Sequence, residues 1–450
     1  MRLAAFDHDR WNTRWRLSRR GFVQVGVATT VGSDLLHGSL SGRSQDTAVI
    51  QIWLGGGPSH IDMYDMKPHA PVECRGVYRP IATNVGGLEI NELLPLQATR
   101  MDRLSVVRTL THPSNDHVTG THAMQTGHLG PTSGSPAPTH PSVGSVIARL
   151  QRANVRGMLP YVHVRPDLPI DLYSRQFDAA YLGQQFAPFT VTMPFPFYSA
   201  DQSVNVRDLQ PLDEIPIERL HQRVALTRAL NESQRTTVVA GAQHDLSLQH
   251  ERALRLLSSG AGQTAFDLSY ESDVIRNAYG RNTWGQGALL CRRLIEAGAS
   301  FVTLNTDSSS NMWDHHGNLK QGFDRQLPAY DQMLAALLDD LVDRGMYDRV
   351  LVVVCGEFGR TPRMNERGGR DHWGRAGFAL LGGGGVRGGH IVGSTTSHGE
   401  EPASHPVTPA DLLATVYHAL GVDWSHTFTD HNGRPIPVLA EGHPISELLK

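Results

Sequence analysis

The chain has 450 residues with a formal net charge of -3 at pH 7, and 40% of them are hydrophobic while 19% are charged. This composition is typical of a globular protein and excludes disordered, fibrous and low-complexity classes. The balanced charge gives no indication of a nucleic-acid partner. Three cysteines, Cys74, Cys291 and Cys355, are too few and too scattered for a disulfide framework or a cysteine-rich metal site. Histidine occurs 23 times, and imidazole is the commonest metal ligand in proteins.

The N-terminal segment resembles an export signal of the twin-arginine type. Arg19 and Arg20 form the arginine pair, and a mildly apolar run follows at residues 25–40. Asp34 interrupts this run and no clear cleavage motif follows, so a cleaved signal, an uncleaved anchor and a basic arm without a targeting role all stay open. We predict that residues 1–46 are an export segment and that the protein is periplasmic, extracellular or on the cell surface. No other apolar stretch is long enough to predict a transmembrane helix.

Beyond residue 46 the sequence alternates between strand and helix patterns. Nearly continuous apolar runs predict buried strands at 48–54, 104–110, 301–304, 350–355 and 378–381. Apolar residues at helical spacing predict helices at 217–230, 286–297, 327–344 and 409–420. This alternation predicts an α/β fold in which a mixed, mostly parallel central sheet is covered by helices on both faces.

Two local features refine this prediction. Thr408 followed by Pro409 is a typical helix start, and Gly421 is placed to end the same helix. The segment 131–216 is rich in Pro and has no clear periodicity, so we predict that it forms long insertions at the strand ends. Residues 47–450 are predicted to form a single domain.

Polar clusters follow the predicted strands. In open α/β sheets, functional groups collect in the loops at the carboxyl ends of the strands. Carboxylates and imidazoles without thiolates indicate a divalent metal site, with zinc or manganese favoured over magnesium or calcium. The candidate residues are His60 and Asp62 after the first strand, Asp116, His117, Thr119 and Thr121 after the second, Asp314 and His316 after the third, and Glu357, Arg360, Asp371 and His372 after the fourth.

Each candidate also has a structural alternative. The acid and histidine pairs could form a hydrogen-bond network that holds irregular loops. Arg360 could bind an anion or tether a neighbouring carboxylate. The glycines at 55–57 are not followed by Gly-Lys-Ser/Thr and do not form a dinucleotide fingerprint, which excludes the common nucleotide-binding loops.

Six motifs together resemble a known family. They are I-W-L-G-G-G-P-S-H-I-D (52–62), P-I-A-T-N-V-G-G-L-E-I-N-E-L-L-P (80–95), D-H-V-T-G-T-H-A-M-Q-T-G (116–127), W-D-H-H-G-N (313–318), G-E-F-G-R-T-P (356–362) and G-R-D-H-W (369–373). In wording and order these motifs are similar to the domain-of-unknown-function 1501 family of exported bacterial proteins. That family is grouped with the alkaline phosphatase and sulfatase superfamily. The resemblance implies an alkaline phosphatase-like fold and hydrolysis of phosphate or sulfate esters at a metal site.

The superfamily pattern carries over to this sequence in part. Asp314 and His316 match an aspartate followed by a histidine, at a shorter spacing, and His372, with Asp371 beside it, matches a later lone histidine. Glu357 keeps the carboxylate of an Asp-His pair, whose histidine is replaced by Phe358.

Two positions depart further from the pattern. The first-strand aspartate falls on Gly56, so that Asp62 or His60 would have to substitute for it. The position of the Ser, Thr or Cys nucleophile is occupied by His117, while the preceding carboxylate, Asp116, is kept. His117 could be the nucleophile itself, Thr119 or Thr121 could replace it, or His117 could be a further metal ligand with water attacking directly, which we favour.

These observations predict a metal-dependent hydrolase of phosphate or sulfate esters acting outside the cytoplasm. Its substrate would be a small-molecule or glycan-linked ester, with Arg360 as the anion-binding residue. The alternatives are a non-catalytic exported binding protein with a decayed site, and a metal that serves structure alone.

Overall fold

The computed structural model describes residues 47–151, 153–155, 158–166, 174–193, 264–306 and 312–450, together with isolated residues between 219 and 226. The predicted export segment at 1–46 therefore lies outside the described residues, as does most of the predicted helix at 217–230.

An eight-stranded sheet forms the centre of the protein, in the order β12-β4-β11-β8-β1-β7-β5-β6. The strands from β8 to β6 are parallel, whereas β11 runs antiparallel to both β8 and β4, and β12 is parallel to β4. This arrangement confirms the predicted mixed, mostly parallel sheet. The strands are β1 (Ala48–Trp53), β4 (Ser105–Leu110), β5 (Tyr161–Pro166), β6 (Phe189–Met193), β7 (Phe301–Asn305), β8 (Val350–Cys355), β11 (Gly377–Gly383) and β12 (Ile391–Val392).

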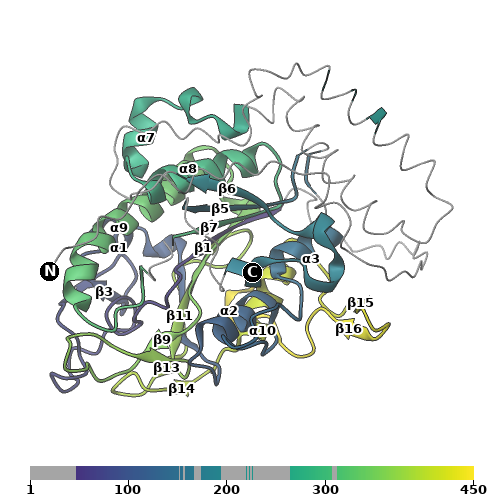
Figure 1. The fold of residues 1–450 in the computed structure, drawn as a ribbon. Helices are drawn as coiled ribbons and strands as arrows, with labels where there is room; N and C mark the ends of the chain where they lie inside the picture. Colours follow the sequence, from purple (N-terminus) through teal and green to yellow (C-terminus); the bar gives the residue numbers. More distant parts are fainter. Residues whose placement is uncertain are drawn as a thin grey trace, which may run out of the picture.

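Helices cover both faces of the sheet, and the central strand β1 shows why (Figure 1). All six of its residues are buried, and successive side chains alternate between the faces. Ile50 and Ile52 enter one hydrophobic cluster, while Val49 and Trp53 enter the other. On the first face lie α1 (Pro95–Ala98), α7 (Asp273–Tyr279), α8 (Thr283–Glu296) and α9 (Leu319–Asp343), and on the second lie α2 (His117–Thr126), α3 (Val143–Leu150) and α10 (Pro409–Leu420).

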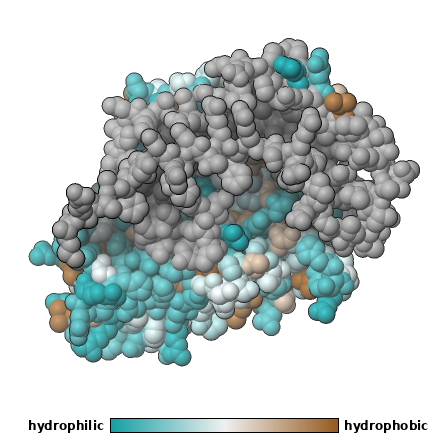
Figure 2. Space-filling model, viewed as in Figure 1, coloured by the Kyte–Doolittle hydropathy of each residue, from teal (hydrophilic) through white to brown (hydrophobic). Residues whose placement is uncertain are grey.

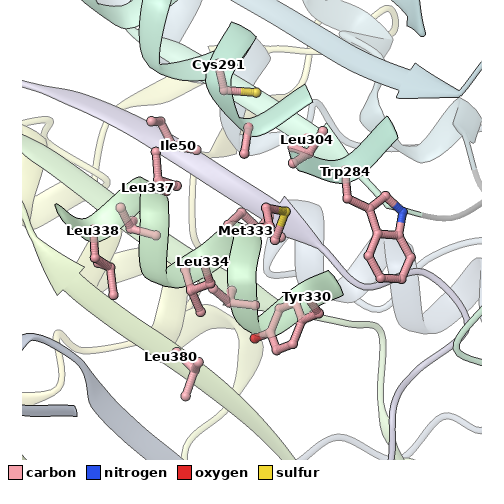
Figure 3. Close-up of a cluster of buried hydrophobic side chains, with 14 of the residues drawn as sticks. Ile50, Trp284, Cys291, Leu304, Tyr330, Met333, Leu334, Leu337, Leu338 and Leu380 are labelled. Atoms are coloured by element: carbon pink, nitrogen blue, oxygen red, sulfur yellow. The ribbon is translucent and has the colours of Figure 1, made fainter. Parts of the chain in front are cut away.

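The first cluster packs α8 and α9 onto the sheet. Figure 3 shows Met333, Leu334 and Leu337 of α9 among side chains of the strands, including Ile50 of β1. Helix α9 begins at Leu319 rather than at the predicted residue 327, and Pro328 lies inside it. The prediction rested on the spacing of apolar residues alone. Although Pro usually disrupts a helix interior, burial of one face of α9 stabilises the longer helix.

The predicted boundaries of the C-terminal helix are confirmed. The Thr408 hydroxyl accepts a hydrogen bond from the backbone N–H of Asp411 at 3.2 Å, and the Asp411 carboxylate accepts one from the backbone N–H of Thr408 at 2.8 Å, which completes a capping box. Pro409 is the first residue of α10, and Gly421 ends it with a φ of 68°.

The Pro-rich segment 131–216 contains more regular structure than its sequence indicates. The sequence predicted insertions, but α3, β5 and β6 lie within this segment, and β5 and β6 extend the central sheet. Strand β5 is buried along its whole length although it includes His163 and Arg165, so its apolar pattern is interrupted and gives a weak signal.

Small two-stranded ribbons and loops surround the sheet. The ribbons are β2 (Pro80–Ala82) with β3 (Glu89–Asn91), β9 (Gly359–Arg360) with β10 (His372–Trp373), β13 (Ser394–Thr395) with β14 (Pro402–Ser404), and β15 (Thr427–Thr429) with β16 (Pro435–Pro437). The described residues on the face in Figure 2 are mostly hydrophilic. Among the described helices, none has the length and apolar character needed to cross a bilayer.

Candidate metal centre

Four strands deliver the candidate residues to one edge of the sheet. Strands β1, β7 and β8 are parallel, and β4 points the same way because β11 runs antiparallel to both β4 and β8. Their carboxyl ends therefore lie at the same edge. The chain reaches Gly56 after β1, His117 at the start of α2 after β4, Asp314 after β7, and Glu357 after β8.

Three imidazole rings converge on the carboxylate of Asp314. The Nε2 atoms of His316 and His372 lie 3.0 and 3.1 Å from its Oδ1, and the Nε2 atom of His117 lies 3.4 Å from its Oδ2. The two Nε2 atoms of His316 and His372 are themselves only 2.9 Å apart. Ligand atoms of His117, Asp314 and His372 all lie within 4.8 Å of one another.

The Nδ1 atom of each of these three rings donates a hydrogen bond to an acceptor outside the cluster. The Nδ1 atom of His117 donates to Oε1 of Glu357 at 2.6 Å, and that of His316 donates to Oδ1 of Asp371 at 2.6 Å. The Nδ1 atom of His372 donates to the carbonyl oxygen of Asn115 at 2.8 Å. In a neutral imidazole with a protonated Nδ1, the lone pair is on Nε2. All three Nε2 lone pairs then face the Asp314 carboxylate, an arrangement that requires a cation or added protons between them.

This donor set suits a divalent metal ion. Imidazole nitrogens whose second N–H is held by a carboxylate or a carbonyl are the usual environment of metal-binding histidines. Three nitrogens with a carboxylate oxygen are typical zinc ligands and also suit manganese. The residues that would hold the ion are His117, Asp314, His316 and His372, and we call these four residues the metal centre below.

The loops approach one another closely here because glycines allow it. Gly56 has a φ of 107°, and its N–H donates to Oε1 of Glu357 at 2.8 Å. A Cβ atom on Gly56 would lie 2.6 Å from the backbone nitrogen of Asp314. On α2, a Cβ atom on Gly120 would lie 3.2 Å from that of Glu357, so the helix packs tightly against this residue.

The electrostatics of the centre favour positive charge. Burial alone would lower the pKa of His117, but its hydrogen bonds to Asp314 and Glu357 raise this pKa to about 9. Burial alone would raise the pKa of Asp314, but hydrogen bonds from His117 and His372 and the charge of Arg360 hold it well below its ordinary value. Without a metal, the negative charge of the centre is thus balanced by a protonated imidazole and a guanidinium.

The centre is closed on one side and open on the other. His117 and Glu357 are buried, whereas the side chains of His316 and His372 are 35% and 20% exposed. The ring of Phe358 lies between these sides, with its centroid 5.0 Å from that of His117 and 4.6 Å from that of His372. A ligand from solvent would therefore approach past His316 and His372.

Three candidates on or before α2 are placed away from the four converging groups. Asp116 is the N-cap of α2, where Oδ1 accepts from the backbone N–H of Thr119 at 2.9 Å and Oδ2 accepts from Ser133 at 2.6 Å. The hydroxyl of Thr119 donates to the Pro131 carbonyl at 2.7 Å. Thr121 is 1% exposed, and its hydroxyl forms no hydrogen bond within the part of the chain that the structure describes.

His60 and Asp62, expected in place of the missing first-strand aspartate, bond to partners outside the four converging groups. His60 is buried with Nε2 2.8 Å from the carbonyl oxygen of Gly399. Asp62 forms a buried ion pair with Arg370 at 2.7 Å and accepts a hydrogen bond from Ser59 at 2.5 Å. Both side chains therefore hold neighbouring loops in place.

The side chain of Arg360 joins Asp314 to the neighbouring loops through hydrogen bonds. Its Nε donates to the carbonyl of Gly57 at 2.6 Å and its Nη1 to that of Arg370 at 3.1 Å. Its Nη2 donates to the Gly56 carbonyl and to Asp314. Since the side chain is 1% exposed and each of its nitrogens donates a hydrogen bond, the arrangement matches the tether and not the anion clamp.

Sequence reasoning assigned no role to two residues that shape the centre. Asn115 supplies the carbonyl that fixes His372, and Asn365 donates to the His316 carbonyl at 3.0 Å and to Asp371 at 3.3 Å. The signal for Asn115 was its place beside Asp116 in a polar motif. Asn365 lies outside every motif, and only the folded loop brings it to Asp371.

Comparisons with solved structures find distant similarity. The PsFucS1 sulfatase from Pseudoalteromonas sp. is 9% identical with a TM-score of 0.35, covering 84% of this chain and 68% of that chain. A protein in the alkaline phosphatase superfamily from Vibrio parahaemolyticus is 10% identical with a TM-score of 0.37, covering 84% and 67%. The phosphonate monoester hydrolase of Agrobacterium radiobacter is 9% identical with a TM-score of 0.36, covering 89% and 77%.

Comparisons of sequence give a family and no characterised relative. Among proteins with curated functions, none matches this chain. Residues 46–449 match the family described as "Protein of unknown function (DUF1501)", which confirms the resemblance seen in the six motifs. Because this match covers nearly the whole chain, the protein belongs to the DUF1501 family.

Proposed function

We propose that this protein is a metal-dependent hydrolase of phosphate or sulfate esters that acts outside the cytoplasm. One observation carries the proposal: the Nε2 atoms of His316 and His372 lie 2.9 Å apart and both face Asp314, with each Nδ1 already donating to an acceptor. A divalent cation would bind both Nε2 atoms and the carboxylate of Asp314 at the same time. Ester hydrolysis is supported by the resemblance of the six motifs to the DUF1501 family, which is grouped with the alkaline phosphatase and sulfatase superfamily, and export is supported by Arg19 and Arg20.

The residues of the chain divide into those that hold the ion and those that orient them. His117, Asp314, His316 and His372 would be the ligands. Glu357 and Asp371 keep the Nδ1 atoms of their histidine partners protonated and fix the two rings. When bound, a divalent cation supplies positive charge that stabilises a transferred phosphoryl or sulfuryl group and lowers the pKa of water.

The described residues favour attack by water. The hydroxyl of Thr119 is committed to Asp116 and Pro131, and Thr121 is buried. His117, which stands at the nucleophile position of the superfamily pattern, has Nδ1 on Glu357 and directs Nε2 toward Asp314, as a ligand would. We therefore assign His117 to the ion and the attacking role to water.

Metal analysis of the purified protein tests the proposal first. The wild type reconstituted with zinc or manganese is expected to hold about one ion per chain, and Asp314→Asn is expected to lose it. Asp348→Asn is the matched control, because Asp348 is 90% exposed and lies before the first residue of β8, at the opposite end of this strand from Glu357. Less than about a tenth of an ion per chain in the wild type would reject the metal site.

Hydrolysis of aryl phosphates and aryl sulfates is the second test. We expect turnover of one ester class that Asp314→Asn and His372→Ala abolish and Asp348→Asn keeps. Activity that survives both substitutions at the centre would belong to a contaminant. Metal binding without turnover of any ester would favour the binding protein with a decayed site. A melting temperature that falls on chelation, again without turnover, would favour a structural ion.

A further inference from the structure

An open groove is lined by residues that follow His316 and precede Asp371 in the chain, among them Asn318, Arg367 and Gly368. Its volume is about 570 Å³, and it lies between the first turns of α9 and the loop that joins β9 to β10. The backbone N–H groups of Asn318 and Leu319 donate to the carbonyls of Arg367 and Gly368, both at 3.0 Å. These bonds join the start of the helix to the loop. The volume is within the range of small-molecule binding sites.

A short series of contacts joins the groove to the centre. The Nη2 atom of Arg367 lies 3.9 Å from Oδ1 of Asp371, the carboxylate that holds His316. Glycine again allows close packing, because a Cβ atom on Gly369 would lie 2.3 Å from the backbone carbonyl carbon of His316. The loop that lines the groove therefore also holds the residues that orient His316.

The charge of the groove is positive. Three cationic side chains, Lys320, Arg325 and Arg367, line it together with one carboxylate, Asp324. Lys320 and the hydroxyl of Tyr78 already bind that carboxylate, at 2.7 and 3.0 Å. The positive charge that remains comes from the two arginines.

Both guanidinium groups can receive a ligand. Arg325 forms no hydrogen bond or ion pair with another described residue, and the Arg367 side chain, 69% exposed, has only the long contact with Asp371. Guanidinium groups bind sulfate and phosphate through paired hydrogen bonds.

We propose that this groove binds a second sulfate or phosphate group carried by the same substrate molecule whose ester lies at the metal centre. The proposal rests on the proposed function for the position of that ester. It narrows the substrate class to small molecules or saccharides that bear at least two anionic groups. Val77 and Met364, which also line the groove, provide apolar contact for the framework between them.

Calorimetric binding of sucrose octasulfate tests the groove without requiring turnover. The full chain is compared with Arg325→Gln, with the double variant Arg325→Gln/Arg367→Gln, and with Arg434→Gln, an exposed arginine on the β15–β16 ribbon that serves as the control for net charge. We expect binding to weaken about tenfold in the double variant and less in the single variant, with no change in Arg434→Gln. Circular dichroism verifies that each variant is folded.

The binding data can overturn the proposal. Equal weakening in Arg434→Gln would mean attraction by overall charge, and unchanged binding in the double variant would mean that the octasulfate binds elsewhere. The groove arginines are not metal ligands. The metal-free Asp314→Asn variant is therefore expected to bind some octasulfate, and the two arginine substitutions are expected to remove this binding.

Kinetics separate this proposal from the proposed function. The ratio of kcat/KM for a glucose bisphosphate over the matching glucose monophosphate, or for the corresponding sulfates, should fall about tenfold in the double variant and stay the same in Arg434→Gln. An equal ratio in the wild type and the double variant would overturn the groove proposal. Absence of hydrolysis of both esters, together with arginine-dependent binding of the octasulfate, would reject the hydrolase and retain the anion-binding groove.

Discussion

Gly56 lies so close to Asp314 that a Cβ atom on the glycine would be 2.6 Å from the backbone nitrogen of the aspartate. The same glycine has a φ of 107° and donates its N–H to Glu357 at 2.8 Å. The turn after β1 thus packs against the backbone of Asp314 and also binds the carboxylate of Glu357. In the superfamily pattern this position is an aspartate, and here its place is taken by a close backbone contact.

Replacement of this glycine should disturb both folding and metal binding. In Gly56→Ala the positive φ and the overlap with Asp314 should lower the free energy of unfolding by about 2–4 kcal/mol. Urea denaturation measures the change. Gly86→Ala is the control, because a Cβ atom there meets no neighbour within 4 Å. Equal stability of the two variants would contradict the close contact.

Glu357 should contribute to metal affinity without touching the ion. Glu357→Gln removes the charge that holds Nδ1 of His117, and loss of such a partner typically weakens metal binding about 10–100-fold. Competition with a chelator measures the affinity. Asp371→Asn should lower the metal affinity less, since that carboxylate is 50% exposed. Glu401→Gln, at another exposed carboxylate, should leave the metal affinity unchanged. If Glu357→Gln bound metal as tightly as the wild type, the orienting role would be wrong.

Asp62 should matter for stability and not for the ion. It pairs with Arg370 at 2.7 Å where the two side chains are 1% and 0% exposed. Asp62→Asn leaves the guanidinium charge buried and uncompensated, which should cost about 3–5 kcal/mol of unfolding free energy. The folded fraction is expected to keep the metal content of the wild type. Metal loss from protein that remains fully stable would instead return Asp62 to the ligands.

Acid should destabilise the protein partly through His163. Burial and then the charge of Arg165 lower the pKa of this histidine on β5 to about 3, whereas an unfolded histidine has a pKa of about 6.5. Between these values the unfolded chain binds a proton that the folded chain does not, so this stability is present above pH 6.5 and is lost as the pH falls.

The variant His163→Gln isolates this contribution. On lowering the pH from 7.5 to 5.5, the wild type should lose about 1.4 kcal/mol more unfolding free energy than the variant. Urea denaturation at the two pH values provides the comparison. The same loss in both proteins would show that His163 is protonated as readily in the folded state as in the unfolded one.

Local sequence determined the most apolar strands of the sheet and the ends of α10. A strand that is buried on both faces needs apolar side chains at nearly every position, so β1 and β8 are visible as continuous runs. The cap of α10 is equally local, because Thr408, Pro409 and Gly421 act on their own turns of the helix. Strand β5 escaped detection because it depends on its neighbours to bury His163 and Arg165.

The sequence also determined where chemistry could occur, since polar motifs followed strands whose carboxyl ends had to share one edge. Which side chains meet there was decided by tertiary structure alone. Asp116 and His117 are adjacent in the chain, yet one caps α2 and the other faces Asp314. The side chains of two adjacent residues point in different directions because of the backbone conformation of the turn in which they lie. That geometry is set by distant contacts, such as those of Gly56 and Arg360, which no short stretch of sequence contains.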